Sequence, residues 1–419
     1  MSWTLEQAET HLLSVELFGM KFGLERMRRV LTALGSPQQA FRSIHVVGTN
    51  GKSSTVRMAA AILEAHGIRT GAYLSPHLSS FAERIRIGDA DLDPDAFGAA
   101  VERAATAAAK VDRTLSGGER VTQFELLTAA AFSELAERGV EAAVVEAGLG
   151  GRHDATNVLA APVAVLTNVG LEHTRWLGPT ITDIAREKLA VVAAGSTLVV
   201  GELEPEAETE VAKVDARVVH ADPAGGAPFT GFQRANFSVA KVAAAEFLAA
   251  AERDPPARPW PATLDEAAVL RAASSVTVPG RFQVVADAPL TIFDGAHNPS
   301  GVAALASALR DAVGEKPLVA VLSVLDDKDA AGMLRELVPL ASGAVFTASR
   351  NPRALSPATL SSLWDQLGGP AAEIEGDPRA AVERAQGLAG EEGAVVATGS
   401  IYLVADLLSE PGRRRASAL

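Results

Sequence analysis

A seven-residue turn, Gly48–Ser54, constrains this chain more than any other feature of its sequence. It follows an apolar run typical of a buried strand and precedes an alanine-rich stretch, Thr55–His66, typical of a helix. A glycine-rich turn between a strand and a helix directs backbone N–H groups and the positive end of the helix dipole toward a phosphate. Lys52 adds a mobile positive charge, and Ser53 adds a hydroxyl suited to Mg²⁺. The turn therefore predicts a nucleotide site. An ordinary glycine-rich turn is the alternative, because Val46 stands where the general P-loop pattern has its first glycine.

The length and charge of the chain limit what surrounds this turn. A chain of 419 residues predicts two domains. The net charge of −13 argues against nucleic acid as a partner, although a local basic pocket could still hold a nucleotide. The absence of cysteine excludes disulfides, thiolate metal sites and cysteine nucleophiles. The polar start of the chain is unlike a signal peptide, and no apolar run approaches the ~20 residues that span a bilayer. We expect a cytoplasmic enzyme without a membrane segment.

Short apolar runs alternate with helical stretches along the first part of the chain. This alternation predicts an α/β domain, in which helices wrap a parallel sheet. The predicted strands are 44–47, 71–74, 142–145, 163–167 and 197–200, and the predicted helices include 95–109, 124–137 and 181–192.

The same alternation restarts after a break near Pro279. The proline-rich segment 254–261 is either a linker or a loop before a last helix, 264–273, of the first domain. We favour the second alternative and predict domains of residues 1–278 and 279–419. The second series consists of predicted strands 290–293, 318–322, 344–347 and 394–397, with helices 302–309, 330–337 and 380–388.

Polar residues follow several predicted strands, at the edge where an open α/β sheet binds its ligands. Ser75 and Glu146 end two strands, and an acid in that place in a P-loop domain usually lies on the Mg²⁺ side. Glu146 could instead be a surface acid, and His173, beyond the next strand, is equally compatible with a structural histidine. Lys188 alone is an ordinary solvated lysine. Asp294, in the second domain, could simply belong to a capped turn.

Taken together, these strings resemble the folylpolyglutamate synthase and dihydrofolate synthase family of the Mur ligase superfamily. Their order and spacing agree over nearly the whole chain, which is more specific than any single motif. The matching strings include the P-loop, Ser75–Leu78, Glu83–Ile85, Thr122–Glu125, Glu146–Asn157, Glu172–His173, Trp176–Gly178, Glu187–Lys188, Pro279–Phe282, Asp294–Pro299 and Thr398–Leu403. The resemblance implies a P-loop Mur-ligase-like central domain followed by a second, smaller Rossmann-like glutamate-ligase domain.

The activity that the resemblance implies is ATP-dependent amide bond formation. The carboxylate of a folate or pteroate-like acid takes the γ-phosphate to become an acyl phosphate, which the amine of L-glutamate then attacks. ATP and Mg²⁺ are the implied cofactors, and the implied protein is a monomer that uses neither nucleic acid nor a membrane.

The resemblance also assigns roles to individual residues. Phosphates and ATP are assigned to Gly48, Thr49, Asn50, Gly51, Lys52, Ser53, Ser54, Asn236, Arg281 and Asp294, and Mg²⁺ to Ser53, Ser75, Glu146 and His173. Lys188 matches a lysine that the superfamily carbamylates, and His297 and Ser400 match positions linked to activity at the domain interface. The acid substrate is assigned to Thr122, Phe124, Arg152, His153 and Asp154.

Several departures leave the acid substrate open. Ser53 stands where folate ligases have glycine, Glu172 where they have aspartate, and the stretch 219–233 is shorter than in the family. Leu17–Met20 replaces a string that some members use for the pteroate. A Mur-type or specialised biosynthetic ligase acting on another carboxylate is therefore the first alternative, and a non-catalytic nucleotide switch is the second. The sequence leaves open the number of folate steps, the polyglutamate length and the amino acid that is added.

Overall fold

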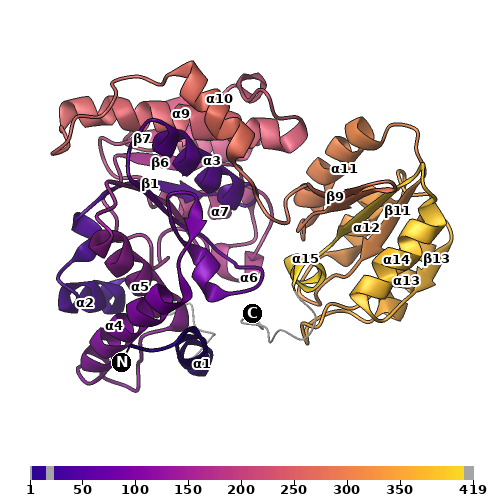
Figure 1. The fold of residues 1–419 in the computed structure, drawn as a ribbon, viewed down its shortest axis with the longest axis horizontal. Coiled ribbons are helices and arrows are strands. Elements are labelled where there is room, and N and C mark those ends of the chain that lie inside the picture. The colour runs from indigo at the N-terminus through magenta and orange to yellow at the C-terminus, as the bar shows by residue number, and fades with distance from the viewer. Residues whose placement is uncertain (1, 16–22, 410–419) are drawn as a thin grey trace. The chain divides into compact units, whose positions relative to one another are not determined.

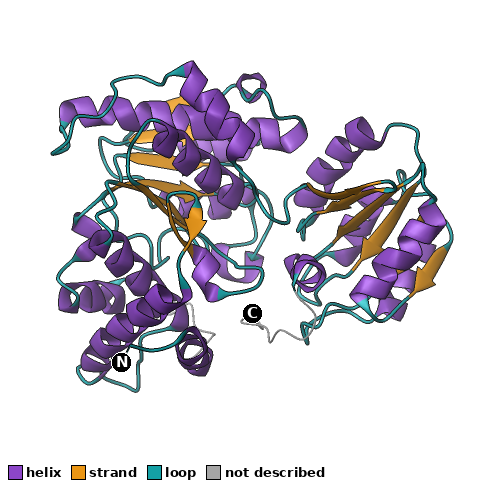
Figure 2. Ribbon diagram, in the orientation of Figure 1, coloured by secondary structure: helices purple, strands orange, loops and turns teal. Residues whose placement is uncertain are grey.

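A computed structural model describes residues 2–15 and 23–409 of the chain. The segment Leu17–Met20 therefore lies outside the described residues. The described chain forms two compact units, each a sheet flanked by helices (Figure 1, Figure 2). Unit 1 comprises the described residues up to Phe229 together with Gln233–Thr277, and unit 2 comprises Thr230–Phe232 together with the described residues from Val278 onward.

Unit 1 is built on an eight-stranded sheet with the order β4-β3-β2-β5-β1-β6-β7-β8. The six strands from β2 to β8 in that order are parallel, whereas β3 and β4 are added antiparallel at one edge. Strand β1 lies between β5 and β6, so the order of strands reverses there, and such a reversal opens a ligand crevice at the carboxyl ends. The strands are β1 (Arg42–Val47), β2 (Thr70–Tyr73), β3 (Ile85–Ile87), β4 (Ala90–Asp91), β5 (Ala142–Glu146), β6 (Val163–Leu166), β7 (Thr197–Val200) and β8 (Arg217–His220).

The helices of unit 1 cover both faces of this sheet. Strands β2, β5, β6 and β7 are buried at every residue, as expected for parallel strands enclosed by helices. In Figure 1, α9 and α10 run along one side of the sheet, and α1, α2, α4 and α5 gather on the other. The helices are α1 (Leu5–Ser14), α2 (Glu25–Ala33), α3 (Lys52–Ala65), α4 (Pro94–Asp112), α5 (Gln123–Glu137), α6 (Thr174–Leu177), α7 (Ile181–Leu189), α8 (Pro205–Val211), α9 (Gly231–Arg253) and α10 (Glu266–Ser275).

Unit 2 is a smaller sheet of six strands in the order β13-β12-β11-β14-β10-β9. Its strands are parallel except for β9, which pairs antiparallel with β10. Its core joins the inner faces of three helices to the buried strands, with Trp364 and Phe346 fully buried and their rings edge to face. The elements are β9 (Gln283–Asp287), β10 (Leu290–Phe293), α11 (Pro299–Val313), β11 (Leu318–Leu322), α12 (Ala330–Leu337), β12 (Gly343–Phe346), α13 (Pro357–Gln366), β13 (Ala372–Ile374), α14 (Pro378–Ala389), β14 (Ala394–Thr398) and α15 (Ile401–Leu408).

These elements confirm the predicted α/β fold class with its P-loop unit and smaller second unit. Several predicted helices have wrong bounds, and the one predicted as 302–309 is α11, Pro299–Val313. The helix predicted as 181–192 ends at Leu189, and the helix after the P-loop begins at Lys52 rather than Thr55. The segment 254–261 is a loop between α9 and α10, within unit 1.

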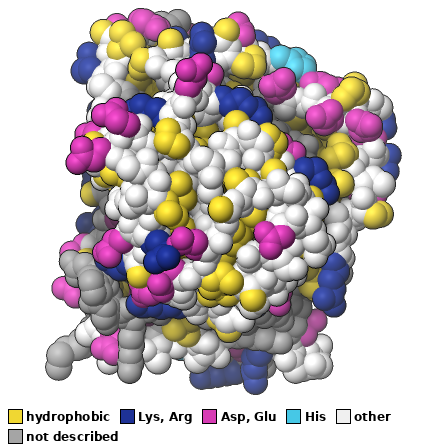
Figure 3. Space-filling view, turned by 90° about the vertical axis from the view of Figure 1, so that its right-hand side faces the viewer, with side chains coloured by type: hydrophobic (Ala, Val, Ile, Leu, Met, Phe, Trp, Pro, Cys, Tyr) yellow, Lys and Arg dark blue, Asp and Glu magenta, His cyan; other side chains and the backbone are white. Residues whose placement is uncertain are grey.

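Two further features are the distribution of charge on the surface and the length and polarity of the helices. Acidic and basic side chains are interspersed on the face shown in Figure 3. Over the two described ranges, no helix is both long enough and apolar enough to cross a membrane.

Candidate active site

The glycine-rich turn after β1 requires glycine at two positions. Gly48 and Gly51 both have positive φ, 153° and 82°. A Cβ on Gly48 would lie 1.8 Å from Thr167 Oγ1, and a Cβ on Gly51 would lie 2.3 Å from Asn236 Oδ1. Both glycines therefore allow a close approach that any side chain would prevent. The second approach places Asn236, from α9, directly against the turn.

Residues that follow β6 hold the turn in shape. The backbone N–H of Asn50 donates to Asn168 Oδ1 at 2.8 Å, and that of Thr49 donates to the Asn168 carbonyl at 3.0 Å. Thr167 Oγ1 donates to the Asn50 carbonyl at 2.6 Å, and Thr49 Oγ1 accepts from the Gly170 N–H at 3.0 Å. Thr167 and Asn168 are not among the predicted site residues. Their place at the end of a buried strand is the signal that could have found them.

Two lysines converge on one carbonyl of the turn. Lys188 Nζ, from α7, donates to the Gly48 carbonyl at 2.6 Å. Lys52 Nζ donates to the same carbonyl and to that of Thr49, both at 3.1 Å. The turn thus holds two amines against the region where backbone N–H groups and a helix N-terminus favour an anion.

Lys188 is buried, so the expectation of an ordinary solvated lysine is wrong. Lys188 is 4% exposed, because it lies on the inner face of α7 together with Ile184, Ala185 and Leu189. Burial, followed by the charge of Lys52, lowers the pKa of Lys188 from 10.5 to about 7. Two acids, Glu172 and Asp154, oppose this shift.

Glu146 joins the turn to the end of β2. Its Oε1 accepts from Ser53 Oγ at 3.1 Å, and its Oε2 accepts from the Ser75 N–H at 3.2 Å. At 1% exposure it is buried rather than solvated, which excludes the surface-acid alternative. Ser53, Ser75 and Glu146 are therefore brought together. Ser54, one residue further into α3, is also buried, at 2% exposure.

His173 lies in the segment that joins β6 to α6. It has a left-handed φ of 51° and precedes helix α6, and its Nε2 is 3.6 Å from Glu172 Oε1. Within residues 2–15 and 23–409, no group of three or more His, Asp or Glu side chains is arranged to hold a metal ion. A divalent ion here would therefore need hydroxyl, phosphate or water oxygens in addition to carboxylate.

The glycine-dense loop after β5 packs against the start of α5. A Cβ on Gly148 would meet the ring of Phe124 at 2.5 Å, so this ring lies on the loop backbone. Thr122 caps α5 by accepting from the Glu125 N–H at 3.2 Å. Asp154 faces its own loop: it accepts from the Leu149 N–H at 2.8 Å and is 5% exposed.

The other two predicted substrate residues make different contacts. Arg152 Nε donates to Glu187 Oε1 at 2.9 Å with half of its side chain exposed. His153 Nδ1 accepts from the Gly23 N–H at 3.3 Å, which places His153 beside the segment that leads into α2. Both lie on the same loop as Asp154, and Phe124 packs against that loop at Gly148.

A second constellation lies in unit 2, at the carboxyl ends of β10 and β14. Asp294 is 3% exposed and accepts from two backbone N–H groups, those of Phe282 and Ala296, both at 2.7 Å. Burial raises the pKa of Asp294, and the charge of Arg281 opposes that rise. A Cβ on Gly295 would lie 2.3 Å from Arg281 Nη1, so the guanidinium crosses this glycine.

Two further predicted residues belong to the same edge. His297 Nδ1 lies 2.9 Å from the Gly295 carbonyl. Ser400, at 1% exposure, caps α15 by accepting from the Tyr402 N–H at 3.1 Å. Since β10 and β14 are neighbours in the sheet, the turns that follow them bring Arg281, Asp294, His297 and Ser400 to one end of unit 2.

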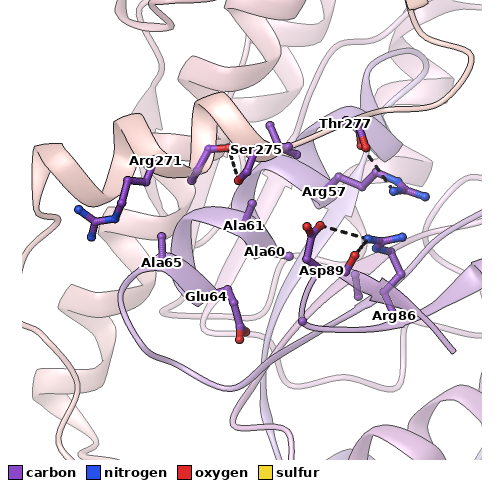
Figure 4. Close-up of a pocket in the computed structure, with 14 residues that line it drawn as sticks. Arg57, Ala60, Ala61, Glu64, Ala65, Arg86, Asp89, Arg271, Ser275 and Thr277 are labelled. Carbon is purple, nitrogen blue, oxygen red and sulfur yellow. Dashed lines mark hydrogen bonds and ion pairs between the residues drawn. The ribbon is translucent and has the colours of Figure 1, made fainter.

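A separate cavity of about 320 Å³ lies in unit 1, away from these groups. It is lined by α3, α10 and the turn between β3 and β4 (Figure 4). Alanines form much of its wall, and Arg57, Arg86 and Arg271 are its basic lining residues. None of the predicted site residues lines this cavity, so it is distinct from the P-loop constellation.

Comparisons with known proteins agree with this arrangement. The profile described as Mur ligase middle domain matches residues 46–242, and the profile described as Mur ligase, glutamate ligase domain matches residues 280–401. The two profiles and the two-unit α/β fold are thus those of a Mur ligase. The chain is 35% identical over 390 residues to the dihydrofolate synthase/folylpolyglutamate synthase of Mycobacterium tuberculosis, which covers 83% of this chain and 78% of that protein.

Solved structures resemble the chain over nearly its whole length. Escherichia coli FolC in complex with DHPP and ADP has a TM-score of 0.83 at 28% identity, with 97% of each chain covered. The bifunctional folylpolyglutamate synthase/dihydrofolate synthase of Yersinia pestis, complexed with AMPPNP and Mn ion, has the same TM-score, identity and coverage. This chain belongs to the dihydrofolate synthase/folylpolyglutamate synthase family of Mur ligases, which confirms the resemblance stated above.

Proposed function

We propose that this protein is an ATP-dependent ligase that joins L-glutamate to the carboxylate of a folate or pteroate-like acid. The observation that carries the proposal is the P-loop turn, in which Lys52, Lys188 and the Ser53–Glu146 pair meet at one strand end. The family and its named relatives supply the acid and the amino acid.

The reaction proceeds in two balanced steps. A carboxylate oxygen of the acid attacks the γ-phosphorus of ATP, the bond to the bridging oxygen breaks, and ADP leaves. The amine of glutamate then attacks the carbonyl carbon of the acyl phosphate, loses a proton and expels inorganic phosphate. Such chemistry asks the protein mainly to position the reactants and to neutralise charge.

The P-loop turn performs both tasks for the nucleotide. We assign the phosphates to the turn Gly48–Ser54. Its backbone N–H groups other than those of Thr49 and Asn50, which donate to Asn168, would bind phosphate oxygens, and Lys52 would exchange its two carbonyl partners for phosphate oxygens. Asn236 contacts this turn at Gly51 and would fix the nucleotide beside it. Arg281 and Asp294 are proposed as the contribution of unit 2 to ATP binding.

The residues around Glu146 fit a magnesium ion. Mg²⁺ prefers oxygen ligands and is usually bound by one or two carboxylates together with phosphate and water oxygens. The buried Glu146 carboxylate with the hydroxyls of Ser53 and Ser75 offers such a set, and His173 is the proposed additional ligand. When bound, the ion would supply positive charge to the phosphate oxygens.

Lys188 fits the proposed carbamate. A buried amine with a pKa of about 7 is neutral in a large fraction of molecules, and only the neutral amine adds to CO₂. The product is an anion, which would lie beside the charge of Lys52. His297 and Ser400 complete the proposed catalytic set from unit 2.

The acid substrate is assigned to the surface formed by Thr122, Phe124, Arg152 and His153. Phe124 offers an aromatic face beside the backbone of Gly148, where a flat heterocycle could stack. Asp154 is proposed to shape this surface from beneath, since its oxygens are occupied by its own loop.

A phosphate-release assay tests the proposal. We expect release only when ATP, Mg²⁺, L-glutamate and either dihydropteroate or tetrahydrofolate are all present. If no pterin acid supports release but another carboxylate does, the folate assignment is wrong and a different ligase is identified. If ATP binds tightly while no acid or amine stimulates turnover, the ligase assignment itself fails.

A further inference from the structure

A buried histidine lies beneath the proposed acid-binding loop. His45, in β1, is 0% exposed, and its Nε2 is 2.8 Å from Thr156 Oγ1. Its Nδ1 has no hydrogen-bond partner among the described residues. A buried nitrogen without a partner is uncommon and calls for a reason. Burial lowers the pKa of His45 to about 4, so the neutral ring carries a single N–H.

The neighbouring carboxylate decides which nitrogen carries that hydrogen. Thr156 Oγ1 donates to Asp154 Oδ1 at 2.5 Å, a distance typical of a hydroxyl bound to an ionised carboxylate. An ionised carboxylate only accepts, so the single hydroxyl hydrogen of Thr156 points to Asp154. The oxygen of Thr156 can then only accept from the ring, which places the hydrogen of His45 on Nε2.

The opposite arrangement is less favourable. If Asp154 were protonated and donated to Thr156, the hydroxyl would donate to Nε2 of His45, and the ring hydrogen would lie on Nδ1. That would leave a buried N–H without an acceptor, which is rarer in proteins than an under-used acceptor. Burial raises the pKa of Asp154, and bonds from the N–H groups of Gly148, Leu149 and Thr156 oppose that rise by stabilising the ionised carboxylate.

We propose that His45 is a positioning residue: its Nε2–H orients the Thr156 hydroxyl, so that Asp154 clamps the loop 147–157 against the strand that carries the P-loop. The clamp sets the shape of the backbone on which Phe124 lies. The functional consequence rests on the proposed function, because that loop is the proposed surface for the acid substrate. The direction of the hydrogen bonds does not depend on it.

Nitrogen NMR on protein with ¹⁵N-labelled histidine tests the clamp without any substrate. The His45 signal, identified by its loss in His45→Gln, should show the Nε2–H tautomer at neutral pH. In His45→Leu, the amide hydrogens of Leu149 and Thr156 should exchange faster with solvent. An Nδ1–H tautomer, or unchanged exchange in His45→Leu, would overturn the proposal even if the enzyme is active.

Kinetics test the consequence with a matched pair of variants. Gln can present an N–H close to the position of Nε2, whereas Leu cannot. We expect His45→Leu to raise the KM for the acid roughly tenfold with an unchanged KM for ATP, and His45→Gln to restore most of the loss. Thr156→Ser should behave like the wild type, and Thr156→Val like His45→Leu.

Melting temperatures of all four variants separate positioning from folding. Equal KM values in His45→Leu and His45→Gln, or a rise in both KM values that follows the loss of melting temperature, would contradict the positioning role. A protein inactive with every pterin acid would refute the proposed function and leave the NMR result to decide the clamp.

Discussion

Replacing Lys188 by alanine removes an amine that the fold makes partly neutral at pH 7. Burial and the nearby charge of Lys52 lower the pKa of Lys188 to about 7, so roughly half of the molecules carry a neutral amine at pH 7. A solvated lysine with a pKa of 10.5 would be neutral in roughly one molecule in three thousand at that pH. The fold thus raises the concentration of the form that adds to CO₂ by about a thousandfold.

We expect Lys188→Ala to lower kcat about a hundredfold, as the loss of one preorganised charged group does in other enzymes. Short carboxylates such as formate or acetate should partly restore the rate by replacing the anion. Lys110→Ala is the matched control, because Lys110 is an exposed lysine of α4. Its kcat should equal that of the wild type, with or without added carboxylate.

Carbon NMR with ¹³C-labelled bicarbonate identifies the anion directly. A protein carbamate signal should be present in the wild type and in Lys110→Ala, and absent in Lys188→Ala. Full activity in CO₂-free buffer, with no carbamate signal and no rescue by carboxylates, would refute the reasoning from the shifted pKa.

Three further predictions concern the same strand end. Between about pH 7 and pH 10.5 the folded protein binds fewer protons at Lys188 than the unfolded chain does, so its free energy of unfolding should increase as the pH rises through that range. Chemical denaturation should show this increase in the wild type and not in Lys188→Met. Glu146→Gln should weaken the affinity for a divalent metal ion about 10–100-fold. The melting temperature should change little, because the amide can still accept from the Ser75 N–H and donate to Ser53 Oγ. An unaltered metal affinity, measured by calorimetry, would show that Glu146 is not part of the metal site. Gly51→Ala should abolish nucleotide binding, since the new Cβ would lie 2.3 Å from Asn236 Oδ1. Gly35→Ala is the control: Gly35 has a similar positive φ with nothing within 4 Å of the new Cβ, so this variant should only lose stability. Equal nucleotide affinities in the two variants would contradict the role of the close contact between Gly51 and Asn236.

Much of the fold could be predicted from the sequence, because its central strands are continuous apolar runs. Strands β7, β10 and β11 and helix α12 have the predicted bounds, and the three strands are each bounded by glycine, proline or polar residues. Helix α9 is not among the predicted helices, although its alanine-rich sequence favours a helix. The edge strands β8 and β13 are short and partly exposed, so they lack the buried pattern that marks the central strands.

Less of the candidate site could be predicted from the sequence, since its chemistry depends on burial and on contacts between residues that are distant in the sequence. The spacing of α7 does not reveal that Lys188 faces the P-loop, 140 residues away along the chain. Glu146 is predicted at a strand end, but its burial follows from β1 and β2 on either side of β5. The link from His45 to Asp154 depends on the contact between His45 and Thr156, which are 111 positions apart, and has no sequence signature.

Isotope transfer from the acid to phosphate tests the central claim of an acyl-phosphate ligase most directly. The acid carboxylate is labelled with ¹⁸O and incubated with ATP, Mg²⁺, L-glutamate and the enzyme, and the released phosphate is analysed by mass spectrometry. One ¹⁸O atom from the acid should appear in each phosphate released during amide formation. Unlabelled phosphate, or the release of AMP and pyrophosphate in place of ADP, would contradict the account.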